Sequence, residues 1–154
     1  MIRTHKRMTL CITLLVLNLA FIWGNSLKPG EVSKAISMWV KDLFFPSGIG
    51  AAPQEGHGLL RKLAHFTEFG CLGAILCWLC AMLRKKPWNS LIYSVLTACA
   101  DEGIQCFVPD RGPGFRDVLI DTAGAALGML LLLAGYAVYK KRKQKLLKLK
   151  ENTK

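Results

Sequence analysis

The amino-acid sequence predicts an all-α membrane protein in which four transmembrane helices form one bundle. Apolar residues make up 52% of the 154-residue chain, and the mean hydropathy is +0.30. The second observation is that basic residues collect at the ends of long apolar runs, as they do beside membrane spans. The third is the runs themselves, each near the ~20 residues that an apolar helix needs to cross a bilayer. They lie at residues 8–23, 63–83, 87–108 and 118–139.

The first apolar run follows a short basic segment, residues 1–7. A basic start, an apolar stretch and the small residues Gly24 and Ser26 also fit a signal peptide with its cleavage point. The run is long for a signal peptide and contains the polar Asn18, so we favour an uncleaved first span and keep cleavage as the alternative.

The connection 28–58 is the longest polar segment, and its basic and acidic residues balance. Within it, Val32, Ile36, Val40 and Leu43 recur at helical spacing, which predicts a short amphipathic helix. This helix would either pack over the bundle or lie in the outer lipid interface.

The second and third spans are separated only by the basic residues 84–86, so we expect them to be antiparallel neighbours. The turn 109–116 (PDRGPGFR) then leads into the fourth span, where Gly124 and Gly128 form a GxxxG pattern that permits close helix contact. Of the 21 basic residues, 14 fall in segments 1–7, 84–86 and 140–154, which predicts that both termini are cytoplasmic. The expected organisation is therefore a basic N-terminus (1–7), a four-helix transmembrane domain (8–139) and a basic tail (140–154).

The net charge of +11 does not indicate nucleic-acid binding, because eight of the basic residues lie in the last 15 positions. Such a tail is expected to rest against anionic membrane lipid. All six cysteines lie inside apolar runs, which argues against a disulfide framework.

Polar and charged residues of three predicted spans fall at one depth, near the outer surface. Ionisable groups at membrane depth are costly, so their gathering there indicates a shared, outward-facing pocket that binds a ligand. The alternative is a self-satisfied network that only holds the helices in register. The candidate ligand-binding residues are Arg61, His65, Glu68, Asp101, Glu102, Gln105, Arg111, Arg116, Asp117 and Asp121.

Two kinds of chemistry are expected in this layer. Arg61, Arg111 and Arg116 would bind a phosphate or carboxylate, because guanidinium groups bind those anions bidentately. His65 and Glu68 share a helix face, so His65 with Glu68 or Asp101 are the candidate acid and base if the protein is an enzyme. Because one histidine is near and no HExxH pattern exists, we assign no metal ligands and expect no cofactor.

The chain resembles the VanZ-like family, named for a teicoplanin-resistance accessory protein. The matching pieces are RKLAHFTEFGCLG (61–73), DEGIQCFVPDR (101–111) and FRDVLIDTAGAALG (115–128). At 121, Asn is expected in many relatives, and Asp here adds a charge. The resemblance implies a small multi-pass protein of the bacterial cell membrane, linked in its founding member to lowered sensitivity to a glycopeptide antibiotic.

The leading hypothesis is a non-enzymatic envelope protein that binds a lipid-linked cell-wall precursor or a glycopeptide or lipopeptide antibiotic and lowers antibiotic susceptibility. The alternative is a membrane-embedded enzyme acting on a phosphorylated or acylated lipid. Transport is a third option; because four spans are few for a transporter, it would require a homo-oligomer.

Overall fold

The computed structural model describes residues 2–44, 55–112 and 114–151. These residues form helices and short connections without a strand, which confirms the predicted all-α class. Residues 45–54 of the expected outer connection lie outside this description. The helices are α1 (Ile2–Ser26), α2 (Gly30–Phe44), α3 (Glu55–Met82), α4 (Trp88–Gln105) and α5 (Phe115–Glu151).

Three of these helices are long and apolar enough to cross a membrane. Their candidate spans are Thr4–Ser26, Gly58–Met82 and Phe115–Lys150, in α1, α3 and α5. Helix α4 occupies the position of the expected third span, but Asp101, Glu102 and Gln105 lower its hydropathy. Length and composition therefore support three spans among the described residues.

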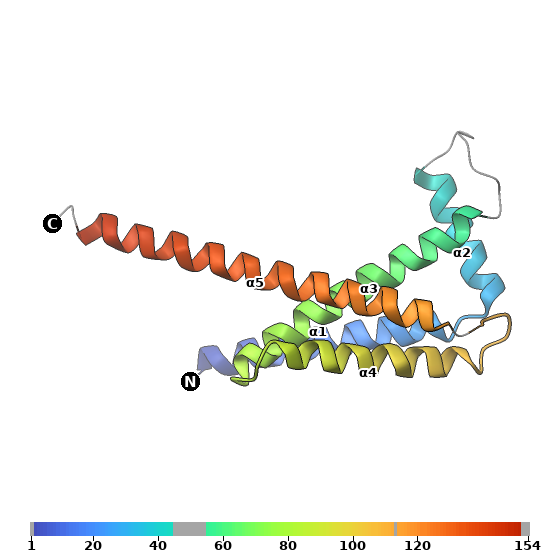
Figure 1. Ribbon diagram of the computed structural model, residues 1–154, viewed down its shortest axis with the longest axis horizontal. Coiled ribbons are helices and arrows are strands. Elements are labelled where there is room, and N and C mark those ends of the chain that lie inside the picture. Colours follow the sequence, from blue (N-terminus) through green and yellow to red (C-terminus); the bar gives the residue numbers. More distant parts are fainter. Residues whose placement is uncertain (1, 45–54, 113, 152–154) are drawn as a thin grey trace.

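The helices run back and forth between two ends of the molecule (Figure 1). The N-terminus, the turn between α3 and α4 and the far end of α5 lie toward one end. The end of α1, helix α2 and the turn between α4 and α5 lie toward the other, which we call the site end. The basic residues 84–86 thus lie toward the same end as both termini.

Helices α3 and α5 cross in close contact because glycines remove the side chains between them. A Cβ atom on Gly124 would collide with the Phe66 carbonyl oxygen, and one on Gly128 with that of Gly70. On the opposing helix, a Cβ atom on Gly73 would collide with the carbonyl oxygen of Ala125. The expected GxxxG contact is thus present, and small residues on both helices form it.

The core is small and mostly central. Ile22, Phe69, Leu72 and Ala125 are fully buried and belong to one cluster to which α1, α3 and α5 contribute. Helix α4 faces the bundle with a stripe of small and polar residues: Ser90, Ser94, Ala98, Asp101, Glu102 and Gln105. Its apolar residues Ile92 and Leu96 are exposed, so α4 is polar inward and apolar outward, as expected of a helix surrounded by lipid.

Helix α2 is the predicted amphipathic helix of the first connection. Ser33, Ser37 and Val40 are half-buried on one side, whereas Trp39 and Leu43 are 66% and 60% exposed. The helix therefore combines the two expected placements: it contacts α3 along one face and leaves apolar side chains free for lipid.

The basic tail continues α5 as a helix. The fourth run was expected to span 118–139, and α5 extends without a break to Glu151. The described part of the tail is exposed.

Candidate functional site

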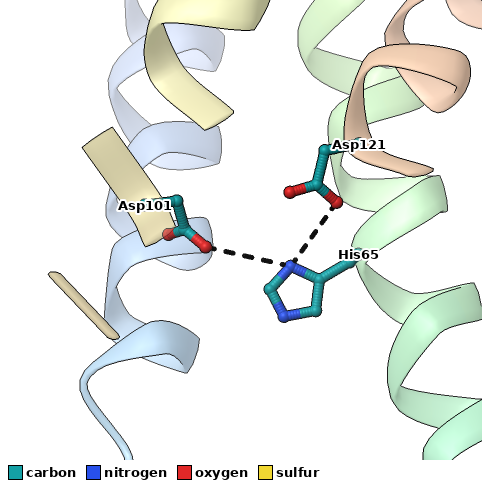
Figure 2. Close-up of side chains that lie close together, drawn as sticks. All are labelled: His65, Asp101 and Asp121. Atoms are coloured by element: carbon teal, nitrogen blue, oxygen red, sulfur yellow. Dashed lines mark ion pairs between the residues drawn. The ribbon is translucent and has the colours of Figure 1, made fainter. Parts of the chain in front are cut away.

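Three ionisable side chains from three helices meet at the site end (Figure 2). The imidazole of His65, on α3, lies between the carboxyl groups of Asp101, on α4, and Asp121, on α5. His65 Nδ1 is 3.9 Å from Asp101 Oδ2 and 3.8 Å from Asp121 Oδ1. Both aspartate side chains are fully buried, and the His65 side chain is 13% exposed. The sequence predicted a common depth for these groups, and in the structure they adjoin.

Asp101 is held in place by two hydrogen-bond donors. The Ser26 hydroxyl donates to Asp101 Oδ2 at 2.7 Å, and Gln105 Nε2 donates to the same oxygen at 2.9 Å. Gln105 also donates to the Ser26 hydroxyl at 3.3 Å. The last turn of α1 is therefore bonded to the polar stripe of α4.

Asp121, unlike Asp101, accepts no hydrogen bond from the described residues. Neither of its carboxylate oxygens has a hydrogen-bond partner among the described residues, and the same holds for Asp101 Oδ1 and His65 Nδ1. Buried carboxylates without a partner are costly. Within the described residues, the protein's own side chains therefore do not satisfy every buried polar atom of this layer.

Glu68 pairs with α1 rather than with His65. Asn25 Nδ2 donates to Glu68 Oε1 at 2.8 Å, and Lys28 Nζ donates to Asn25 Oδ1 at 2.9 Å. Asn18 Nδ2 donates to the Glu68 backbone oxygen at 3.4 Å. Of the two expected acid–base partners of His65, Asp101 lies beside it, whereas Glu68 bonds to Asn25.

Two further acidic side chains, those of Glu102 and Asp117, have their partners near the start of α5. Glu102 Oε2 accepts a 2.7 Å hydrogen bond from the backbone N–H of Gly114, just before the helix begins. Asp117, in the first turn of α5, forms a 3.5 Å ion pair with Arg61. That position is favourable because the positive end of the helix dipole lies there.

Arg111 binds backbone rather than a carboxylate. Its Nε donates to the Lys28 carbonyl at 3.0 Å and its Nη2 to the Asn25 carbonyl at 2.8 Å, so it closes the end of α1. Burial lowers the pKa of this guanidinium from its ordinary value. Its Nη1 is buried and has no partner within the described segments. The residue also lines the pocket between α2 and α3.

Arg116 lies apart from this group. Its side chain is exposed at the start of α5, and it forms no ion pair or hydrogen bond within the described segments. The structure therefore brings together nine of the ten residues expected in the layer and leaves Arg116 at its edge.

Sequence reasoning missed the contribution of α1, namely Asn18, Asn25 and Ser26, and that of Lys28 in the turn after it. Asn18 was noticed only as a polar residue in an apolar run, and Ser26 only as a small residue at a cleavage point. The usable signal was their position: the end of the first span reaches the same depth as the other polar groups.

A pocket opens beside this group, between α2 and α3. Its volume is about 170 Å³, and His65 and Glu68 line it together with the basic residues Lys28, Arg61 and Arg111. A larger hollow of about 580 Å³ shares Arg61 with it and adds Lys34 and Asp110. Apolar residues, among them Ile36, Val40 and Leu60, form another part of the wall of the first pocket. The pocket can therefore offer cations to an anionic group and apolar surface to a hydrocarbon chain.

Comparisons with known proteins locate this fold in a family. No curated protein and no solved structure matches the chain. A family model described as VanZ/LLP1 matches residues 8–137, which include all five helices except the ends of α1 and α5. That range covers most of the chain and contains the three sequence pieces on which the resemblance was based. The chain belongs to the VanZ-like family.

Proposed function

We propose that the protein is a four-span protein of the bacterial cell membrane, with both termini in the cytoplasm. The apolar faces of α1, α3 and α5 require lipid, and α4 packs against all three of these helices. Helix α4 would cross with them despite its lower hydropathy, because its charged residues face the bundle and its exposed residues are apolar. The fully buried Ile22 and Ser26 support an uncleaved first span, since both contribute to the packed bundle.

We infer that the site binds an amphiphile with an anionic head group and a hydrocarbon tail. The observation that carries this inference is the pocket in which Lys28, Arg61 and Arg111 adjoin apolar residues of α2 and α3. Guanidinium and ammonium groups together favour phosphate over an uncharged head group. The exposed apolar residues of α2 would extend the contact along the tail.

A lipid-linked cell-wall precursor has this chemistry on the outer face of a bacterial membrane. The VanZ-like membership adds the link to glycopeptide sensitivity that the family is named for. Binding of the precursor, or of a glycopeptide or lipopeptide antibiotic, would then lower antibiotic susceptibility. The test should separate these ligands by measuring each with purified protein.

The experiment compares polyprenyl phosphate with the neutral polyprenol of the same length, using native mass spectrometry of detergent-purified protein. The proposal expects the phosphate to be retained and the alcohol to be lost, and Lys28→Ala and Arg61→Ala to weaken retention about tenfold or more. Lys86→Ala, at the opposite end, is the matched control and should bind as the parent does. Equal retention of phosphate and alcohol by all four proteins would overturn the proposal.

A second candidate function is that of a membrane-embedded enzyme, because His65 adjoins two carboxyl groups next to the pocket. In that reading His65 with Asp101 or Asp121 would transfer a proton to or from a phosphorylated or acylated lipid. Turnover of such a lipid by the parent protein and its loss in His65→Gln would favour this function over simple binding.

A further inference from the structure

We propose that His65, Asp101 and Asp121 form a binding site for one divalent metal ion, of the kind that accepts imidazole and carboxylate ligands, such as Mn²⁺ or Zn²⁺. From the sequence we assigned no metal ligands, because it offers a single nearby histidine and no HExxH pattern. The inference goes beyond the ligand pocket and does not rest on it.

The first argument is geometric. One ligand atom from each of the three residues can be chosen so that all lie within 4.8 Å of one another. Metal–ligand bonds of ~2.1 Å allow two ligands of one ion to lie up to ~4.2 Å apart. The separations of 3.8 and 3.9 Å between His65 Nδ1 and the carboxylate oxygens are within that limit. They are too long for hydrogen bonds, so both carboxylates face His65 Nδ1 at ion-pair distance and leave room for an ion between them. The chosen oxygens of Asp101 and Asp121 lie within 4.8 Å of each other, so they must approach by at most about 0.6 Å to bind the same ion.

The second argument is the state of Asp121. Its side chain is fully buried, it points toward His65 (Figure 2), and both of its oxygens lack a hydrogen-bond partner in the described part of the chain. His65 Nδ1 also lacks a hydrogen-bond partner within that part. Native structures seldom leave such atoms unpaired, and unpaired ones call for a ligand. A metal ion would satisfy all of them together.

The third argument is charge. Asp101 and Asp121 bring two buried carboxylates together, and no arginine forms an ion pair with either of them among the described residues. Arg61 pairs with Asp117, and Arg111 donates to the carbonyls at the end of α1. One divalent cation with a neutral imidazole would balance the two carboxylates, which makes the burial of these groups tolerable.

The surroundings of Asp101 also fit a ligand carboxylate. Metal-binding carboxylates are commonly oriented by hydrogen bonds from a second layer of residues. Ser26 and Gln105 supply two such bonds to Asp101 Oδ2. Three protein ligands leave further coordination positions free, as in catalytic metal sites, and His65 itself lines the pocket beside Arg61 and Arg111. An anionic group in that pocket could therefore reach the ion.

Mn²⁺ is the preferred probe, because the six cysteines are free thiols and would compete for Zn²⁺. The full-length protein is purified in detergent, stripped with a chelator and titrated with Mn²⁺, with free Mn²⁺ followed by electron paramagnetic resonance. We expect about one bound Mn²⁺ per chain, displaced by added Zn²⁺. Asp121→Asn and His65→Gln should each weaken binding about tenfold or more. Asp42→Asn removes an exposed carboxylate from α2 and should bind Mn²⁺ as the parent does.

A variant could also lose Mn²⁺ binding because it is poorly folded, so the unfolding temperature is measured with and without Mn²⁺. Mn²⁺ should raise the unfolding temperature of the parent and of Asp42→Asn but not that of Asp121→Asn. Without metal, Asp121→Asn should be at least as stable as the parent, because it removes a buried carboxylate whose oxygens accept no hydrogen bond within the described residues. The proposal is overturned if the parent binds neither Mn²⁺ nor Zn²⁺, or if it binds no better than Asp121→Asn. No lipid is present in this assay, so its failure would leave the proposed ligand pocket untouched.

Discussion

The hydroxyl of Ser26 donates a 2.7 Å hydrogen bond to the carboxylate of Asp101, and both side chains are completely buried. The two residues lie on α1 and α4, at the end of the molecule where His65 and Asp121 also meet. The bond therefore links the first helix to the polar site.

Ser26→Ala should destabilise the protein, because it removes a buried donor to a carboxylate. The expected loss is about 1–3 kcal/mol of the free energy of unfolding. It can be measured as a lowered unfolding temperature of the detergent-purified protein. Ser37→Ala is the control: Ser37 donates only to the Ser33 carbonyl of its own helix, so a similar loss there would show that the effect is not specific to Asp101.

Gly128→Ala should weaken the contact between α3 and α5. The added methyl group would meet the Gly70 backbone carbonyl, which cannot rotate away as a side chain can. Overpacking of this kind costs about 1–3 kcal/mol. Fluorescence-detected size exclusion after heating measures the loss. Gly135→Ala on the same helix meets nothing within 4 Å and should be neutral or slightly stabilising, so equal effects would contradict the packing argument.

Arg111→Lys should be nearly as harmful as Arg111→Ala. The planar guanidinium donates to two carbonyls at once, which a single ammonium group does not reproduce. We expect either change to cost about 1–3 kcal/mol and to be visible as a lower unfolding temperature. Arg116→Ala is the charge-matched control because its side chain is exposed. Full stability of Arg111→Lys would show that charge alone suffices.

The proposed topology can be tested with native Cys106, which is exposed after the end of α4. A membrane-impermeant maleimide should label it in intact cells, and Cys106→Ser should remove that label. Lys86→Cys in the Cys106→Ser background should react only after the membrane is opened. Labelling of residue 86 in intact cells would contradict the proposed topology: either the orientation would be the reverse or the number of spans would differ.

The helices could be predicted because apolar periodicity and basic flanks are local signals, and the structure confirms the all-α class and the helix in the first connection. The four-span count was predicted from apolar runs, yet the composition of α4 alone does not support it. Its charged and polar stripe is buried against the other helices, and hydropathy does not record such packing.

Which side chains contact each other at the site was harder to predict than the common depth at which they lie. His65 and Glu68, three positions apart, differ by about 60° around the helix, so one can face α4 and α5 while the other faces α1. Their common face suggested an acid–base pair, whereas Glu68 bonds Asn25 and His65 adjoins Asp101 and Asp121. Sequence spacing could not show which neighbouring helix each would meet.

The close approach of α3 and α5 could be predicted only in part from the sequence. The GxxxG pattern of α5 predicted a contact but not its partner, and Gly70 and Gly73 on α3 went unnoticed. Their spacing places them on one side of α3, which is the signal that could have paired the two helices.

The two connections at the site end are fastened to each other. Besides the Arg111 contacts, the Gly30 N–H donates to the Pro109 carbonyl at 3.2 Å, and a Cβ atom on Gly30 would collide with the Asp110 backbone. Asp110 itself adopts a φ of 58°. An epitope tag inserted between residues 107 and 112 would therefore disturb both connections, although the segment looks like an ordinary surface loop. Engineering of this protein should place reporters at the C-terminal tail instead.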